Sequence, residues 1–192
     1  MAIVLTGFGP FGQHKVNASW EAVRLVPGLW EDSEHPLVVE EIPVDYSWVQ
    51  AREEARWKEA FFTVHVGVSH LATAVTLECR GHNSGYCRPD VAGACPPGET
   101  CQPEGREEIS TCLDMSALLA MVEAARSETK FELSEDAGRY LCDFVYYRSL
   151  HCSEGRSLFI HVPPLDTPYT ARQLARAIAA VLRAIVTIRA GK

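Results

Sequence analysis

The sequence predicts an α/β protein with a three-layer α/β/α arrangement, in which helices cover both faces of a mostly parallel, twisted central sheet. Short runs that are apolar at nearly every position alternate along the chain with longer segments of helical spacing. Continuous apolar runs are typical of strands that helices cover on both faces, and alternating strands and helices indicate a parallel sheet. In such sheets ligands bind at the carboxyl ends of the strands, so functional residues are expected there.

Five segments have the character of buried strands. Each is five to eight residues long and rich in β-branched or aromatic residues, and most of them end at or next to a glycine or proline. They are residues 2–6, 37–44, 61–68, 74–78 and 156–163.

Five further segments are predicted to be helical. Asn17, Ser47 and Asp114 precede three of them, and each side chain can accept a hydrogen bond from a free amide of the first turn. Pro27 and Gly28 follow the first helix and are expected to end it. The predicted helices are residues 19–26, 48–60, 115–127, a helix after Gly138 that holds Cys142, and residues 170–188.

The composition is that of a globular protein of 192 residues, with 47% apolar and 22% charged residues. This length fits one domain spanning residues 1–192. The net charge of −7 argues against nucleic acid or an anionic membrane as the main partner. The sequence has no apolar run near the roughly 20 residues of a membrane span, and its start lacks the pattern of a signal peptide. We therefore expect a soluble, cytosolic protein, most simply a monomer, without a cofactor.

Five of the seven cysteines fall within residues 79–112. An odd number of cysteines without a signal peptide argues against a disulfide framework. Their spacings lack the paired C-x-x-C form of common zinc sites, so no metal is expected there. This segment is also rich in glycine, proline and charged residues, and it is predicted to be a long irregular excursion.

The loop GFGPFG at residues 7–12 matches the G-x-G-x-x-G pattern of dinucleotide-binding proteins. In that motif a helix starts at the glycines, but here four residues, QHKV, separate them from the helix cap at Asn17. Pro10 also lacks the N–H that a phosphate would need. Phe8 and Phe11 suggest instead a flat apolar slot for a small planar ring, although one of them is expected simply to pack beneath the loop.

Cys142 is either a buried core thiol or a nucleophile. Burial alone explains many free cysteines, but a helix amino end and a nearby histidine favour the reactive thiolate. His161 ends a strand and is the candidate base, and Glu78 ends another and could orient the imidazole. On spacing alone, a solvated carboxylate is the favoured interpretation of Glu78.

The other histidines are weaker candidates for the base. His65 lies earlier in its strand, and His70 and His82 are expected in loops that could still approach the thiol. Exposed positions are expected for His14, His35 and His151.

Four blocks together resemble the pyroglutamyl-peptidase I family of cysteine omega-peptidases, and are most similar to its animal members. The blocks are GFGPFGxxxxNxSWEAV, HVGVSHLATAVTLE, DAGRYLCDFVYY and FIHVPP. The resemblance implies an α/β/α fold that removes an amino-terminal pyroglutamyl residue from peptides. It places the family's catalytic residues on Cys142, His161 and Glu78. It places the aromatic residues that hold the pyroglutamyl ring on Phe8 and Phe11, and the asparagine that follows their loop on Asn17.

Two departures from the family pattern leave a second interpretation open. Asp143 follows the cysteine where bacterial members usually carry asparagine, and its charge would oppose a thiolate unless it points away. Residues 79–112 match poorly, so the arginine of the bacterial loop could correspond to Arg80 or Arg88. The alternative is a catalytically weakened paralogue that binds pyroglutamyl peptides.

Overall fold

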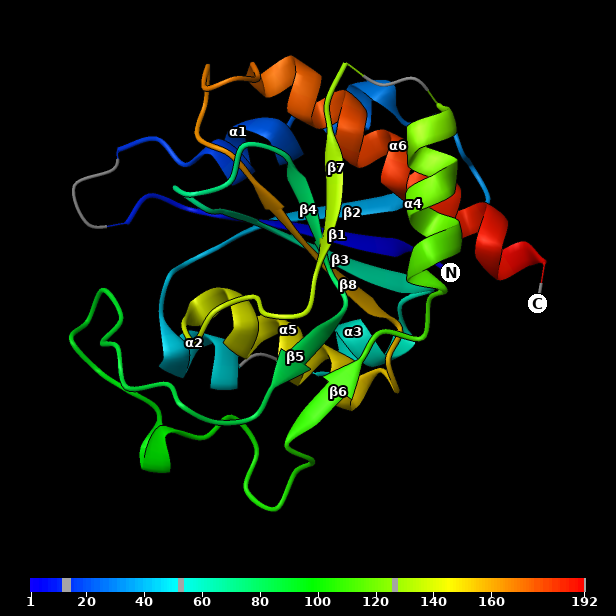
Figure 1. Ribbon diagram of the computed structural model, residues 1–192. Coiled ribbons are helices and arrows are strands. Elements are labelled where there is room, and N and C mark those ends of the chain that lie inside the picture. The colour runs from blue at the N-terminus through cyan, green and yellow to red at the C-terminus, as the bar shows by residue number, and fades with distance from the viewer. Residues whose placement is uncertain (12–14, 52–53, 126–127, 192) are drawn as a thin grey trace.

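A sheet of six strands forms the centre of the computed structural model, which describes residues 1–11, 15–51, 54–125 and 128–191 (Figure 1). The strand order is β2-β1-β3-β8-β4-β7. The first four strands run parallel, β4 pairs antiparallel with β8, and β7 pairs parallel with β4. The mostly parallel sheet that the sequence predicts is therefore confirmed. The strands are β1 (Ile3–Phe8), β2 (Leu37–Ile42), β3 (Phe62–Val68), β4 (Val75–Glu78), β7 (Phe131–Ser134) and β8 (Ser157–Val162).

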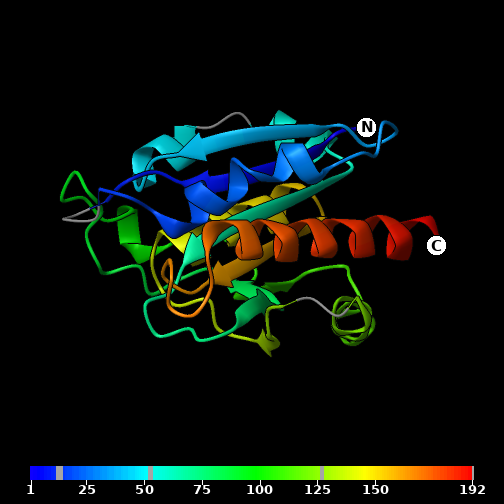
Figure 2. The ribbon, with the colours of Figure 1, turned by 90° about the horizontal axis from the view of Figure 1, so that it is seen from above.

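Helices cover both faces of this sheet, as the three-layer prediction requires (Figures 1 and 2). One face carries α1 (Ala18–Val23), the short 3-10 helix η1 (Val26–Leu29), α4 (Met115–Ala124) and the long α6 (Ala171–Ala190). The other carries α2 (Tyr46–Ala51), α3 (Ala55–Glu59) and α5 (Leu141–Cys152). No helix of the described part of the chain is long and apolar enough to cross a membrane.

Strand alternation divides the core into two clusters. Side chains of successive strand residues point to opposite faces. In β8, Leu158 and Ile160 pack in the cluster under α1, α4 and α6, whereas Phe159 packs against α5. The α5 face is the more aromatic, and its fully buried residues include Phe144 and Tyr146.

Two of the three predicted helix caps are confirmed. The side chain of Asn17 accepts from the amide of Ser19, and that of Asp114 accepts from the amide of Ala117. The prediction that Ser47 caps a helix is wrong. Asp45, two residues earlier, accepts from the Trp48 amide at 2.8 Å.

Three predicted helix ends also differ from the structure. The helix expected over residues 48–60 is two short helices, α2 and α3, and residues 52–53 between them lie outside the described chain. Pro27 and Gly28 do not stop α1, which ends at Val23; they lie within η1. The helix expected over residues 115–127 ends at Ala124, and residues 126–127 are outside the described chain.

The segment 79–112 is more ordered than the sequence predicts. β5 (Arg80–His82) pairs antiparallel with β6 (Glu108–Ser110), and a 3-10 turn, η2, covers Pro97–Glu99. Tyr86 is fully buried and packs edge-on against Phe144 of α5. Strands of three residues are too short to show periodicity, which is why they were not predicted. Across the described residues, no group of three or more His, Cys, Asp or Glu is placed to hold a metal ion.

Candidate active site

Cys142 lies at the amino end of α5, as its distance from Gly138 predicts. Gly138 has φ +84°, a left-handed conformation that glycine adopts easily, and it turns the chain toward the helix that starts at Leu141. Cys142 is thus the second helical residue, where backbone N–H groups lack helical partners and the helix dipole favours negative charge. The half-buried side chain is accessible from a hollow of the surface.

His161 links this thiol to a carboxylate. Its Nδ1 lies 2.7 Å from Oε1 of Glu78, and the Cys142 side chain is close enough to influence the pKa of the ring. Burial alone would lower the pKa of His161, but the hydrogen bonds and charges of Cys142 and Glu78 together raise it to about 10. The imidazole therefore interacts with both Cys142 and Glu78 and holds a proton readily.

The strand arrangement that brings Glu78 to His161 differs from the one expected from the sequence. β4 runs antiparallel to β8, so the carboxyl ends of the two strands do not share an edge of the sheet. Thr76 lies directly opposite His161, and Glu78, opposite Phe159, approaches the imidazole from the diagonal position. Glu78 is 2% exposed, so the interpretation as a solvated carboxylate is wrong.

Gly67 provides the space for the thiol. It pairs with His161 across β3 and β8, and a Cβ at this position would lie 2.9 Å from Sγ of Cys142 and 2.7 Å from the Phe159 ring. This role was not predicted from the sequence, although a glycine inside an apolar strand often marks a close approach of another group.

An apolar cavity of about 240 Å³, the ring cavity, opens beside the thiol. This is below the roughly 300–1,000 Å³ of cavities that hold drug-sized ligands, so it suits a small ring. Both predicted aromatic residues line it: Phe8 is almost fully buried and Phe11 is half-buried. Its other lining residues are Asn17, Val44, Val68, His70, Arg88, Tyr140, Leu141 and Cys142.

Asn17 fixes the loop that carries the two phenylalanines. Its Nδ2 donates to the carbonyl of Gly9 at 3.0 Å, while its Oδ1 accepts from both the amide and the hydroxyl of Ser19. Ser19 in turn accepts from the amide of Phe8 at 3.0 Å. One buried side chain therefore caps α1 and sets the wall of the cavity.

The two candidate arginines are separated clearly. Arg80 pairs with Glu108 on β6 and with Glu135 in the segment after β7. Arg88 lines the cavity, with its guanidinium 4.4 Å from the centre of the Tyr140 ring. Neither Arg88 nor Tyr140 has a distinctive sequence signal, since both depend on how the 79–112 segment folds back on the sheet.

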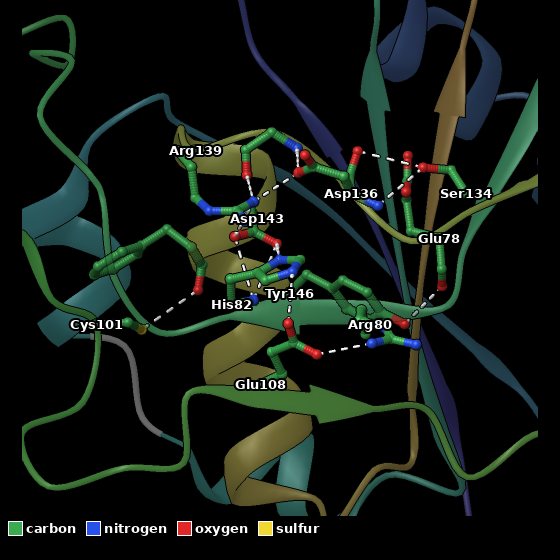
Figure 3. Close-up of polar contacts among 12 residues, drawn as sticks. Glu78, Arg80, His82, Cys101, Glu108, Ser134, Asp136, Arg139, Asp143 and Tyr146 are labelled. Carbon is green, nitrogen blue, oxygen red and sulfur yellow. Dashed lines mark hydrogen bonds and ion pairs between the residues drawn. The ribbon is translucent and has the colours of Figure 1, made fainter.

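Asp143, directly after the thiol residue, is fully buried and bound by other groups (Figure 3). Its carboxylate accepts from the amide of His82 at 3.2 Å and from the hydroxyl of Tyr86 at 3.0 Å, and it lies 3.6 Å from the Arg139 guanidinium. Burial raises the pKa of Asp143 to about 6, although these partners oppose the shift. The carboxylate contacts β5 and the segment that follows it, whereas Cys142 contacts β3 and β8.

The other histidines have different surroundings. His65 is fully buried and hydrogen-bonded to β1, His70 lines the ring cavity, and His82 lies in β5 rather than in a loop. The expected exposure is found for His151 but is wrong for His35, which is half-buried beside a carboxylate. The remaining one, His14, lies outside the described residues.

Comparison with known proteins places this chain in a family. The sequence model of the pyroglutamyl peptidase family matches residues 1–188. The chain belongs to this family. Among its relatives, pyroglutamyl-peptidase 1 of Homo sapiens is 47% identical over 189 residues, covering 97% of this chain and 90% of the human protein. A second human relative, named pyroglutamyl-peptidase 1-like protein, is 35% identical over 158 residues, covering 81% of this chain and 80% of that protein.

The fold of this chain also matches that of solved structures. The crystal structure of pyrrolidone carboxyl peptidase from Thermus thermophilus superimposes with a TM-score of 0.83 at 28% identity. The match covers 95% of this chain and 99% of the Thermus chain, so the predicted α/β/α fold is confirmed.

Proposed function

We propose that this protein is a cysteine peptidase that removes an amino-terminal pyroglutamyl residue from peptides through an acyl-enzyme. The observation that carries this proposal is the grouping of the half-buried Cys142 with the buried His161 and Glu78 beside an apolar cavity of about 240 Å³. Membership of the pyroglutamyl peptidase family supports the same reaction.

The cavity suits the pyroglutamyl ring, which is a small planar lactam without a charged α-amine. Phe8 and Phe11 offer apolar ring faces to the lactam. Because the lactam has no free amino group, no carboxylate is needed in the cavity to bind one. We infer that backbone groups near His70–Leu71 and around Cys142 pair with the lactam N–H and C=O. An ordinary amino terminus would lose its hydration here without gaining an ion pair.

In the proposed reaction, the thiolate of Cys142 attacks the pyroglutamyl carbonyl carbon and His161 takes the thiol proton. The negative charge that develops on the carbonyl oxygen is stabilised by free N–H groups at the start of α5. As the C–N bond breaks, His161 gives its proton to the leaving amine. Water, deprotonated by His161, then hydrolyses the thioester, and Glu78 holds the imidazole in the tautomer that both steps require.

Hydrolysis of a pyroglutamyl-coumarin substrate tests this assignment. The Cys142→Ala variant should lose turnover, since it lacks the attacking sulfur. Cys152→Ala is the matched control, because Cys152 lies at the other end of α5 and burial raises the pKa of its thiol to about 12. A prolyl-coumarin substrate should not be cleaved, because the described residues that line the cavity offer its charged amine no carboxylate.

Labelling with iodoacetamide provides a second measurement. We expect Cys142 to react first of the seven cysteines, and a pyroglutamyl aldehyde to protect it. Turnover by Cys142→Ala would refute the proposed nucleophile. A protein that binds the aldehyde but never hydrolyses the substrate would instead be the weakened paralogue.

A further inference from the structure

The active-site thiol lies between two hollows. Cys142 lines both the ring cavity and a larger, open cleft of about 680 Å³, whereas His161 lines only the cleft. If the proposed function is correct, His161 must protonate the leaving amine, so the peptide beyond the scissile bond has to lie in the cleft. The residues of this cleft therefore contact the part of the substrate that follows the pyroglutamyl residue.

A row of three side chains crosses the sheet along this cleft. Thr76 of β4 lies opposite His161 of β8 on one side and opposite Glu132 of β7 on the other. Partners in register project to the same face of a sheet, and all three line the cleft. Adjacent strands are about 4.8 Å apart, so the backbone at Glu132 lies about 10 Å from that at His161. A long side chain on the residue after the pyroglutamyl group can span most of this distance. The side chain of Glu132 covers the remainder, so its carboxylate can contact the end of the substrate side chain.

The charge of Glu132 is not compensated by a neighbouring cation. Its Oε1 accepts from the Thr76 hydroxyl at 2.8 Å, which orients the exposed carboxylate, and among the described residues no Lys, Arg or His forms an ion pair with it. Asp136 is the other acid in the outer cleft, which is the part of the cleft formed by β7 and the segment after it. It is bound at 2.6 Å by Arg139 (Figure 3).

Two other charges border this region. Glu78 is engaged by His161, and Arg88 stacks on Tyr140 where the cleft meets the ring cavity. Arg88 keeps its positive charge at this inner end of the cleft. In the outer cleft, among the described residues, Glu132 is the acid without a cationic partner and presents its negative charge to a substrate.

We propose that this cleft favours peptides in which lysine or arginine directly follows the pyroglutamyl residue, and that Glu132 binds the basic side chain. Solvent screens an ion pair at such an exposed position, so the expected preference over an acidic residue is about two- to fivefold. This inference rests on the proposed function and adds a substrate class to it.

The test compares kcat/KM for three peptide amides that differ only at the second residue: pyroglutamyl-alanine, pyroglutamyl-lysine and pyroglutamyl-glutamate. Amidation removes the terminal carboxylate, and the released amine is measured directly. The wild-type protein should prefer lysine over glutamate by about two- to fivefold, and about 1 M salt should reduce the ratio. In Glu132→Gln, which keeps an acceptor for Thr76, the ratio should fall to about one.

Glu123→Gln is the matched control, because it removes the same charge from an exposed position on α4 outside the cleft. It should keep the wild-type ratio. Equal rates for lysine and glutamate in the wild type, a preference for glutamate, or a preference that persists in Glu132→Gln would each overturn the inference. Cleavage of pyroglutamyl-alanine separates the two proposals: if it occurs without a charge preference, only this inference fails, and if it is absent, the proposed function fails with it.

Discussion

The buried carboxylate of Asp143 should make the stability of this protein depend on pH in a direction opposite to that of most carboxylates. Burial raises the pKa of Asp143 to about 6 in the folded state, against 3.8 for an unperturbed aspartate side chain. Between these two values the folded chain binds more protons at this site than the unfolded chain. Stability from this group is therefore complete below pH 3.8 and is lost as the pH rises through 6.

The magnitude follows from linkage. For pKa values of 6 folded and 3.8 unfolded, the contribution of Asp143 falls by about 1.3 kcal/mol between pH 5 and pH 7. Asp143→Asn lacks this titration but keeps an oxygen that can accept from the amide of His82. The difference in free energy of unfolding, variant minus wild type, should thus rise by about 1.3 kcal/mol over this interval.

Chemical denaturation of both proteins at pH 5, 6 and 7 measures this difference directly. In thermal denaturation the same change corresponds to roughly 3–5 °C for a chain of this length. Asp136→Asn is the control, because burial there is outweighed by hydrogen bonds from Gly138 and Arg139, which lower the pKa of Asp136 below 3.8. This carboxylate is ionised throughout the interval, so the variant-minus-wild-type difference for Asp136→Asn should stay constant from pH 5 to 7. A variant-minus-wild-type difference for Asp143→Asn that is constant from pH 5 to 7 would show that this carboxylate is already ionised at pH 5, and would refute the reasoning.

Three further predictions concern the proposed active site. Gly67→Ala should reduce kcat/KM by at least about 100-fold with an unchanged circular dichroism spectrum, because its methyl group would displace the thiol of Cys142; near-normal turnover would contradict the packing described. Glu78→Gln should reduce kcat/KM by at least about 100-fold and move the alkaline limb of the pH profile to lower pH, since it removes a carboxylate that raises the pKa of His161; an unmoved limb would mean that the ion pair is unimportant. Asn17→Ala should lower the free energy of unfolding by about 1–2 kcal/mol and raise KM more than it lowers kcat; a change in kcat alone would argue against a role in shaping the cavity.

Local patterns predicted much of this fold because they reflect local causes. The apolar run of β3 and the cap at Asn17 act within a few residues, and both were correctly identified. The direction of β4 depends on how the chain returns to the sheet, which periodicity does not record. β7, with two exposed residues among four, has too little apolar character to be recognised as a strand.

The candidate site was predictable to a similar extent. Cys142 and His161 stand at element ends that the sequence marks, so their meeting could be expected. The burial of Glu78 and the close approach at Gly67 follow from strand register, which no single segment encodes. The environment of Asp143 depends on β5, which is too short to predict.

The alternation of side chains across the sheet divides this molecule into two halves that could be engineered separately. The α5 side of the sheet carries the side chains of Phe8, Glu78 and His161, and Gly67 faces the same side. The apolar strand residues that alternate with them pack beneath α6. Substitutions that improve packing around α6 act on contacts that the proposed catalytic residues do not share, and effects at such distant sites usually add. A thermostable version could therefore be assembled on the α6 side alone, with the specificity of the α5 side left for independent redesign.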